Sequence, residues 1–96
     1  MKTITIRSQN ITDWDSLHTV FAEAFNFPEY YGRNMDAWID CIDEFTDETT
    51  VINMGDCREL RKKAPEIITA ILECSAFINY RRLNTGSSTF LIVSIL

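Results

Sequence analysis

The chain has 96 residues, a net charge of −5 at pH 7 and 46% hydrophobic residues. This length fits one domain, residues 1–96, because a fold of this size buries about two-thirds of the surface that its unfolded chain exposes. The apolar content excludes a disordered protein, and no apolar stretch approaches the roughly 18 residues that span a bilayer. The first residues alternate apolar and polar side chains without the continuous apolar run of a signal peptide, so we expect a cytoplasmic protein.

Cysteine and histidine are sparse in this chain. Cys41, Cys57 and Cys74 show no Cys-x-x-Cys spacing, and His18 is the single histidine. A structural zinc site needs four closely spaced ligands of these types. We therefore expect reduced cysteines, a structural role for His18, and neither a metal ion nor a cofactor.

The negative charge is concentrated in the middle of the chain. Residues 13–50 hold ten acidic side chains and one basic side chain, whereas residues 1–12 and 51–96 each carry a net charge of +2. An acidic middle argues against binding to nucleic-acid phosphates, which requires clustered Lys and Arg. It favours a basic partner, although a solvated acidic face is the ordinary explanation of such a cluster.

The first half of the chain predicts one strand and two helices. Residues 2–7 alternate as a strand does, and Thr12 predicts the N-cap of a helix that Pro28 ends. Asn34 is a good N-cap for a second helix that runs to about Phe45. The first helix carries an aromatic-rich stripe that we expect to pack inward: Trp14, Leu17, Phe21, Ala24 and Phe25.

The second half predicts two more strands with two helices between them. Residues 49–54 are β-branched and apolar, and Gly55 ends this strand. Asp56 can cap a short polar helix, and Pro65 suits the first position of a longer one. The longer helix has an apolar stripe at helical spacing: Ile67, Ile68, Ile71, Leu72, Ser75 and Ile78. Residues 89–96 are almost continuously apolar, as in a strand that is covered on both faces.

Strands that are separated by helices predict a parallel sheet with right-handed crossovers. The expected fold is therefore α/β: one small domain, with a three-stranded parallel sheet packed with about four helices in two or three layers.

The helix that follows Asn34 separates acidic from apolar side chains. At about 100° per residue, one narrow face holds four acids: Asp36, Asp40, Asp43 and Asp47. The opposite face, which we expect to be buried, holds Trp38, Cys41, Ile42 and Phe45. Ile39 falls on the border, closer to the acids. Like charges four residues apart destabilise a helix by a few tenths of a kcal/mol per pair, a cost that a basic partner would offset. On these grounds alone, a solvated acidic face remains the favoured interpretation.

The segment from Phe27 to Cys41, FPEYYGRNMDAWIDC, resembles the signature of the barstar family of ribonuclease inhibitors. In that family, an apolar-Pro-Glu-Tyr-Tyr-Gly-x-Asn-apolar-Asp-Ala stretch runs into an Asp-Cys pair. The close match covers about 15 to 20 residues and agrees in the spacing of the loop, the helix cap and both acids. Beyond it, the resemblance rests on length and on the order of the elements. It implies a three-stranded parallel sheet with helices.

The resemblance also implies a mechanism, in which the acidic helix enters and occludes the catalytic cleft of a basic nuclease. Asp40 matches the central residue of this plug, expected to meet arginines and a catalytic histidine, and Asp36 matches a flanking acid. The expected partner-binding residues are Tyr30, Tyr31, Gly32, Asn34, Met35, Asp36, Ile39, Asp40, Asp43, Phe45 and Glu66. The free protein is expected to be a monomer that forms a one-to-one complex and performs no chemistry. Neither nucleic acid nor a membrane is expected as a direct partner.

Two positions depart from the family's pattern. Arg33 stands where members carry an acidic residue, and Ile39 stands where they carry an aromatic one. The tryptophan of this helix is one position earlier, at Trp38. These changes touch the recognition surface and leave the fold intact, so the sequence leaves the identity of the target nuclease open.

Other functions stay open at this point. An enzyme could use Asp36 and Asp40 as paired carboxylates, but the chain offers no nucleophile elbow, glycine-rich phosphate loop or second histidine. Metal binding by the acidic face would lack an ordered ligand loop. The stronger competitor is a binding module of the same fold, either an immunity protein against a toxin that is not a ribonuclease or an adaptor without nuclease inhibition. The basic stretch 58–63 is a candidate second contact, although a solvated face is its ordinary interpretation.

Overall fold

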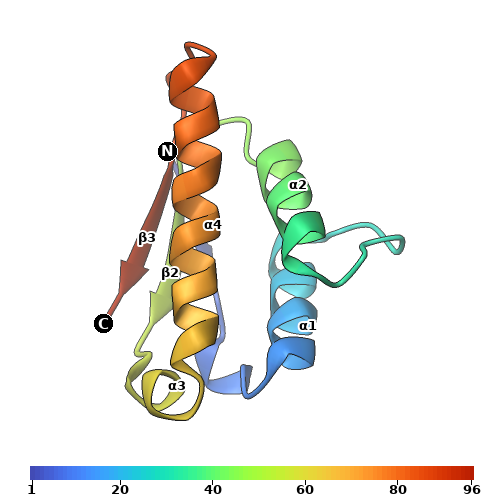
Figure 1. Ribbon diagram of the computed structural model, residues 1–96, viewed down its shortest axis with the longest axis vertical. Helices are drawn as coiled ribbons and strands as arrows, with labels where there is room; N and C mark the ends of the chain where they lie inside the picture. The colour runs from blue at the N-terminus through green and yellow to red at the C-terminus, as the bar shows by residue number, and fades with distance from the viewer.

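The computed structural model describes all residues, 1–96, and shows a three-stranded sheet with four α-helices (Figure 1). The elements in chain order are β1 (Lys2–Thr5), the 3-10 helix η1 (Ser8–Asn10), α1 (Trp14–Phe25), α2 (Met35–Phe45), β2 (Thr50–Gly55), α3 (Arg58–Lys63), α4 (Pro65–Asn84) and β3 (Leu91–Ile95). The predicted α/β class, the parallel sheet and the number of helices are confirmed. None of the helices combines the length and the apolar character that crossing a membrane requires.

The strands are parallel and lie in the order β1-β2-β3, with β2 in the centre. Ile52 of β2 pairs with Ile4 on one side and with Val93 on the other, so the three side chains share one face of the sheet. Ile52 is fully buried and its two neighbours are half-buried. Right-handed crossovers between neighbouring strands place every helix on the same face. The fold therefore has two layers, one of strands and one of helices.

The second face of the sheet meets solvent. Thr3 and Ile92 flank Val51 on this face, and Ile92 is 45% exposed. The expectation that residues 89–96 are covered on both faces is therefore wrong. The strand is apolar, but it lies at an edge of a two-layer fold in which no helix covers its outer side.

The core lies between the sheet and the three longer helices and contains 21 buried hydrophobic residues. Trp38 of α2 is fully buried, and its ring meets that of Phe21 of α1 edge-on, with centroids 5.4 Å apart. The prediction that Trp38 belongs to the core is confirmed. The predicted stripe of α4 is buried except for Leu72, which lies at its border and is 43% exposed.

The start of α1 differs from the prediction. Asp13 and not Thr12 is the N-cap, because the Asp13 carboxylate accepts a hydrogen bond from the Ser16 amide at 2.8 Å and completes a capping box with that serine. Trp14 is then the first residue of the helix. Side chains in a helix tilt toward its N-terminus, so Trp14 extends past the end of the core and is 43% exposed instead of buried.

Candidate protein-binding surface

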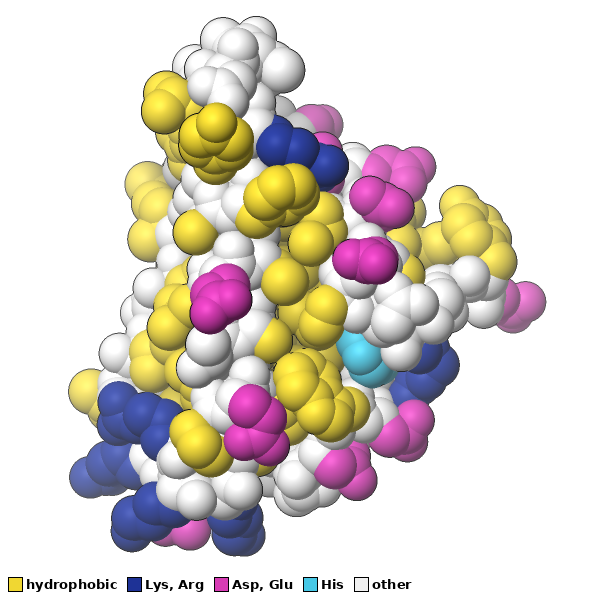
Figure 2. All heavy atoms as spheres, in the orientation of Figure 1, with side chains coloured by type: hydrophobic (Ala, Val, Ile, Leu, Met, Phe, Trp, Pro, Cys, Tyr) yellow, Lys and Arg dark blue, Asp and Glu magenta, His cyan; other side chains and the backbone are white.

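Helix α2 presents its acidic face to solvent. The side chain of Asn34 caps the helix by accepting a hydrogen bond from the Ala37 amide at 2.8 Å. Trp38 faces the core, and the opposite face carries Asp36 and Asp40, both exposed. Acidic side chains gather over α2 in Figure 2, on the side of the molecule away from the sheet. The sequence prediction of an amphipathic helix with its acids outward is therefore confirmed for these two residues.

An apolar margin adjoins these acids. Met35 and Ile39 of α2 and Cys74 of α4 are half-buried and pack against the edge of the core. Phe77 of α4 is 47% exposed, and Figure 2 shows a continuous run of hydrophobic side chains between α4 and α2. The carboxylate of Asp40 thus lies beside apolar surface, a combination suited to a protein partner because apolar contact and charge can be buried together.

The two tyrosines of the preceding loop point in opposite directions. Tyr30 is 81% exposed, whereas Tyr31 is 8% exposed and its hydroxyl shares a 2.6 Å hydrogen bond with Nδ1 of His18. Burial lowers the pKa of His18, with a further contribution from the Arg33 charge, and burial raises the pKa of Tyr31. At neutral pH the phenol therefore keeps its proton, and the hydrogen bond joins it to a neutral imidazole. The structure places Tyr31 beneath the expected binding surface and Tyr30 upon it.

Gly32 fits closely onto the start of α2. A Cβ at this position would lie 3.3 Å from Cβ of Ala37 and 3.5 Å from the Asn34 amide nitrogen. That same nitrogen donates a 3.3 Å hydrogen bond to the Gly32 carbonyl. A larger residue would push the loop away from the helix, so the glycine brings the loop and α2 into one surface.

Arg33 does not extend toward the acidic face. Its Nη2 donates to the carbonyl of Asp15 at 2.8 Å, to Oδ1 of Asp15 at 2.8 Å and to Oγ1 of Thr19 at 2.9 Å. These acceptors lie on α1, so the one basic side chain of residues 13–50 is turned back against the protein and paired there.

Asp43, which was expected among the partner-binding acids, is bound within the molecule. Its Oδ1 accepts a hydrogen bond from Nε of Arg82 at 2.9 Å, and its Oδ2 lies 3.4 Å from Nη2 of Arg81. Sequence reasoning gave no role to these two arginines. The sequence does contain an indication of this contact. Helix α2 ends without the glycine that commonly closes a helix, so its last carbonyls need hydrogen-bond donors from elsewhere in the chain.

The remaining expected contacts lie around the edges of this surface. Phe45 was expected to be buried, but it is the last residue of α2 and is 40% exposed, with its ring packed 6.1 Å from that of Phe27. Glu66 is exposed in the first turn of α4. Asp47 is exposed beyond the end of α2, so it does not continue the acidic face of the helix.

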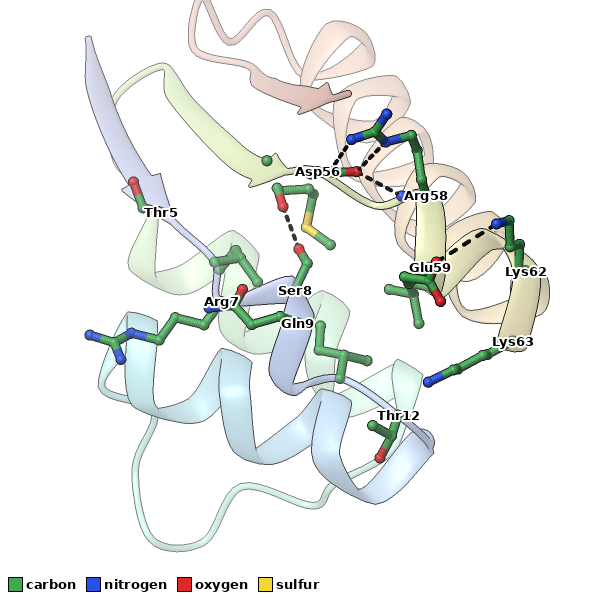
Figure 3. Close-up of a pocket in the computed structure, with 15 residues that line it drawn as sticks. Thr5, Arg7, Ser8, Gln9, Thr12, Asp56, Arg58, Glu59, Lys62 and Lys63 are labelled. Carbon is green, nitrogen blue, oxygen red and sulfur yellow. Dashed lines mark hydrogen bonds and ion pairs between the residues drawn. The ribbon is translucent and has the colours of Figure 1, made fainter.

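The largest hollow of the molecule lies elsewhere, where β1 and β2 end beside α3 (Figure 3). It measures about 720 Å³, and its lining includes much of the basic stretch 58–63. Arg58 is bound by Asp56 at 2.7 Å, and Lys62 lies 3.7 Å from Glu59. Two of the nearby cations are thus paired within the chain. No group of three His, Cys, Asp or Glu side chains in the molecule is arranged to hold a metal ion.

The fold and this surface together define a class of protein. The protein is a two-layer α/β domain in which Asp36 and Asp40 are exposed on a helix beside an apolar margin and line none of the hollows of the molecule. Such a surface is suited to binding another protein, because its exposed charge and its apolar margin can be buried together against a partner.

Comparison with known proteins identifies the family. Residues 1–92 match the model of the family described as Barstar (barnase inhibitor), and the chain belongs to that family. The resemblance inferred from the sequence is therefore confirmed. A Bacillus subtilis (strain 168) protein named "Putative ribonuclease inhibitor YrdF" is 36% identical to this chain over 47 residues. The matched region covers 49% of this chain and 52% of that relative, about half of each.

Proposed function

We propose that this protein inhibits a ribonuclease by inserting α2 and the loop before it into the basic active site of the enzyme. One observation carries the proposal. Asp36 and Asp40 are exposed on one face of α2 and form no ion pair or side-chain hydrogen bond within the chain, whereas Asp43 on the same helix is held by two arginines. Two free carboxylates on a rigid helix are suited to arginines and lysines that otherwise bind RNA phosphates.

The energetics favour such a complex. Opposite charges on the two surfaces raise the rate of encounter, and arginine–carboxylate hydrogen bonds that are buried at the interface slow dissociation. The apolar margin formed by Met35 and Ile39 would supply hydrophobic contact around Asp40. Inhibition then follows from occlusion alone, in a one-to-one complex that needs neither a cofactor nor a chemical step.

The rest of the surface divides into contacts and supports. The proposed contacts around the two acids are Tyr30, Gly32, Asn34, Met35, Ile39, Phe45 and, at the edge, Glu66. We assign Tyr31 and Asp43 to the support of this surface, because the hydroxyl of Tyr31 is bound to α1 and the carboxylate of Asp43 is bound to α4. The family and the name of the B. subtilis relative support a ribonuclease as the target.

The proposal is tested by capture followed by a nuclease assay. The immobilised protein is used to capture partners, and the cleavage of RNA by the captured protein and by barnase is measured with increasing amounts of free inhibitor. We expect stoichiometric loss of RNA cleavage for at least one of these enzymes. A captured partner that cleaves DNA instead would favour an immunity protein, and a partner whose nuclease activity persists in excess inhibitor would contradict inhibition.

A matched pair of variants locates the site. Asp40→Ala should weaken binding by about 2–5 kcal/mol, because a basic group of the enzyme loses its buried partner. Asp47→Ala removes the same charge from an exposed position beyond the end of α2 and should change affinity little. Equal affinities for the two variants would remove Asp40 from the centre of the interface.

A further inference from the structure

We propose that Arg33 is a positioning residue, which clamps the loop 28–34 onto α1 and so holds the recognition surface in its binding conformation. The inference rests on the proposed function for its consequence and on the contacts of the free protein for its geometry. Arg33 lies between Gly32 and Asn34, two of the proposed contacts. It is also one of the positions at which this sequence departs from the family's pattern.

The clamp is formed by one guanidinium nitrogen and two residues of α1. Nη2 of Arg33 lies 2.8 Å from both the carbonyl oxygen and Oδ1 of Asp15, and 2.9 Å from Oγ1 of Thr19. Asp15 and Thr19 are four residues apart, so they stand on the same face of the helix. The contact therefore joins the loop to a rigid element and not to another part of the loop.

The backbone of Arg33 shows why a clamp is needed. Its φ angle is 52°, in the left-handed region that residues with a Cβ rarely adopt. Such a conformation persists only where surrounding contacts hold it. In this loop, the side-chain contacts of Arg33 itself supply that restraint, and they keep Asn34 in place to cap α2.

A second contact pins the same loop to the same helix. The Tyr31 hydroxyl binds His18, which lies between Asp15 and Thr19 on α1. Tyr31 and Arg33 therefore both bind α1, the first as a buried side chain and the second at the surface, while Tyr30 and Gly32 remain exposed for a partner. Binding then requires little further ordering of the loop, and a preordered loop loses less conformational entropy when a complex forms.

The clamp also explains how a cation is accommodated beside an acidic recognition surface. The Arg33–Asp15 pair is neutral as a unit, with side chains 42% and 84% exposed. Arg33 thus need not repel a basic enzyme. If Arg33 instead acted through its own charge, replacing Arg33 and replacing Asp15 would have opposite effects on association, because the first makes the surface more negative and the second makes it less negative.

The test compares Arg33→Met with Asp15→Asn in the full-length protein. The first readout is amide hydrogen exchange of the free variants. The Tyr31 amide, which donates to the Pro28 carbonyl at 3.0 Å, reports on the loop. We expect its exchange to accelerate several-fold in Arg33→Met, which loses all three contacts, and by less in Asp15→Asn, which keeps the acceptors on the Asp15 backbone and on Thr19. The double variant should exchange no faster than Arg33→Met, because the two residues act through one contact. The controls Arg7→Met and Glu23→Gln change the same charges at exposed side chains without an ion pair and should leave the loop unchanged.

The second readout is the rate of dissociation from the captured ribonuclease. Both single variants should dissociate faster despite their opposite changes in charge, Arg33→Met by several-fold and Asp15→Asn by less. Unchanged exchange at Tyr31, or additive effects in the double variant, would show that Arg33 does not clamp the loop. Faster exchange without faster dissociation would show that the clamp does not serve binding. Because exchange is measured without any nuclease, a failure of the clamp is distinguishable from a failure of wild-type protein to inhibit.

Discussion

Arg82 of α4 binds the carboxylate of Asp43 on α2 and also closes the carboxyl end of that helix. Its Nε lies 2.9 Å from Oδ1 of Asp43, and its Nη2 donates to the carbonyls of Asp43 and Thr46 and to the Thr46 hydroxyl, at 3.1, 2.9 and 2.7 Å. The arginine is 8% exposed. A cation at the C-terminus of a helix is favoured by the helix dipole and by the free carbonyls there. The acidic helix is therefore held at this end by α4.

Replacing Arg82 should destabilise the protein substantially. Arg82→Ala leaves the buried carbonyl and hydroxyl of Thr46 without this donor, and a buried group left without a partner costs about 1–3 kcal/mol. Arg81→Ala is the matched control. Its 3.4 Å contact with Asp43 joins two partly exposed side chains, and such pairs contribute about 0–1 kcal/mol. Urea denaturation of both variants measures the difference, and equal losses would contradict the assignment of the buried contact to Arg82.

Trp38 should tolerate phenylalanine better than alanine. Its ring is fully buried against Phe21, but its Nε1 has no hydrogen-bond partner. Trp38→Ala creates a cavity and should cost about 3–5 kcal/mol. Trp38→Phe keeps an aromatic ring and removes the unsatisfied N–H, so its cost should be clearly smaller. Denaturation measures both changes, and a ribonuclease-binding assay of Trp38→Phe at a temperature where it is folded should show nearly normal affinity. A large loss of affinity in that folded variant would place Trp38 at the interface.

The contrast between Trp38 and Asp43 shows how far the sequence could predict this surface. The position of Trp38 follows from helical periodicity and the Asn34 cap, both of which are local, and the prediction was correct. The inward orientation of Asp43 depends on an arginine 39 residues further along the chain. No periodicity within α2 reports such a contact. The acidic face was therefore predicted correctly at Asp36 and Asp40, and Asp43 could be assigned only with α4 in place.

The loop shows the same boundary between local and tertiary information. Tyr30 and Tyr31 are adjacent and chemically identical, and an irregular loop has no repeating pattern that separates an exposed residue from a buried one. His18 decides which tyrosine is buried, and it lies on another helix. Likewise, a strand was correctly predicted within residues 89–96, where β3 spans Leu91–Ile95, but the apolar composition could not show that one face lacks a covering helix.

Stability should fall as the pH is lowered through the titration range of His18. Burial holds the pKa of His18 below its ordinary value of 6.5, the Arg33 charge adds to this effect, and Asp15 opposes it. The unfolded chain therefore binds a proton at a higher pH than the folded protein does. The contribution of the neutral imidazole is fully present above about pH 6.5 and is lost as the pH falls from there toward the lower pKa of the folded state. Urea denaturation between pH 8 and pH 5 should show this loss, and His18→Gln should remove most of the slope because carboxylates titrate mainly at lower pH. An unchanged slope in that variant would assign the pH dependence to other groups.

Association with the ribonuclease should depend strongly on salt, and the two kinds of acid on α2 should affect different rates. The screening length shortens from about 10 Å at 0.1 M salt to about 3 Å at 1 M, so the association rate should fall by about tenfold or more over this range.

Glu44 is exposed on α2 outside the proposed centre, and Glu44→Gln should mainly slow association. Asp40→Asn removes the same charge, but it should mainly accelerate dissociation, because its partner is buried in the complex. Stopped-flow association and surface-based dissociation measurements separate the two rates. An association rate that does not change with salt would mean that the acidic face does not steer the encounter, and equal dissociation rates for the two variants would mean that Asp40 is not buried against a basic group.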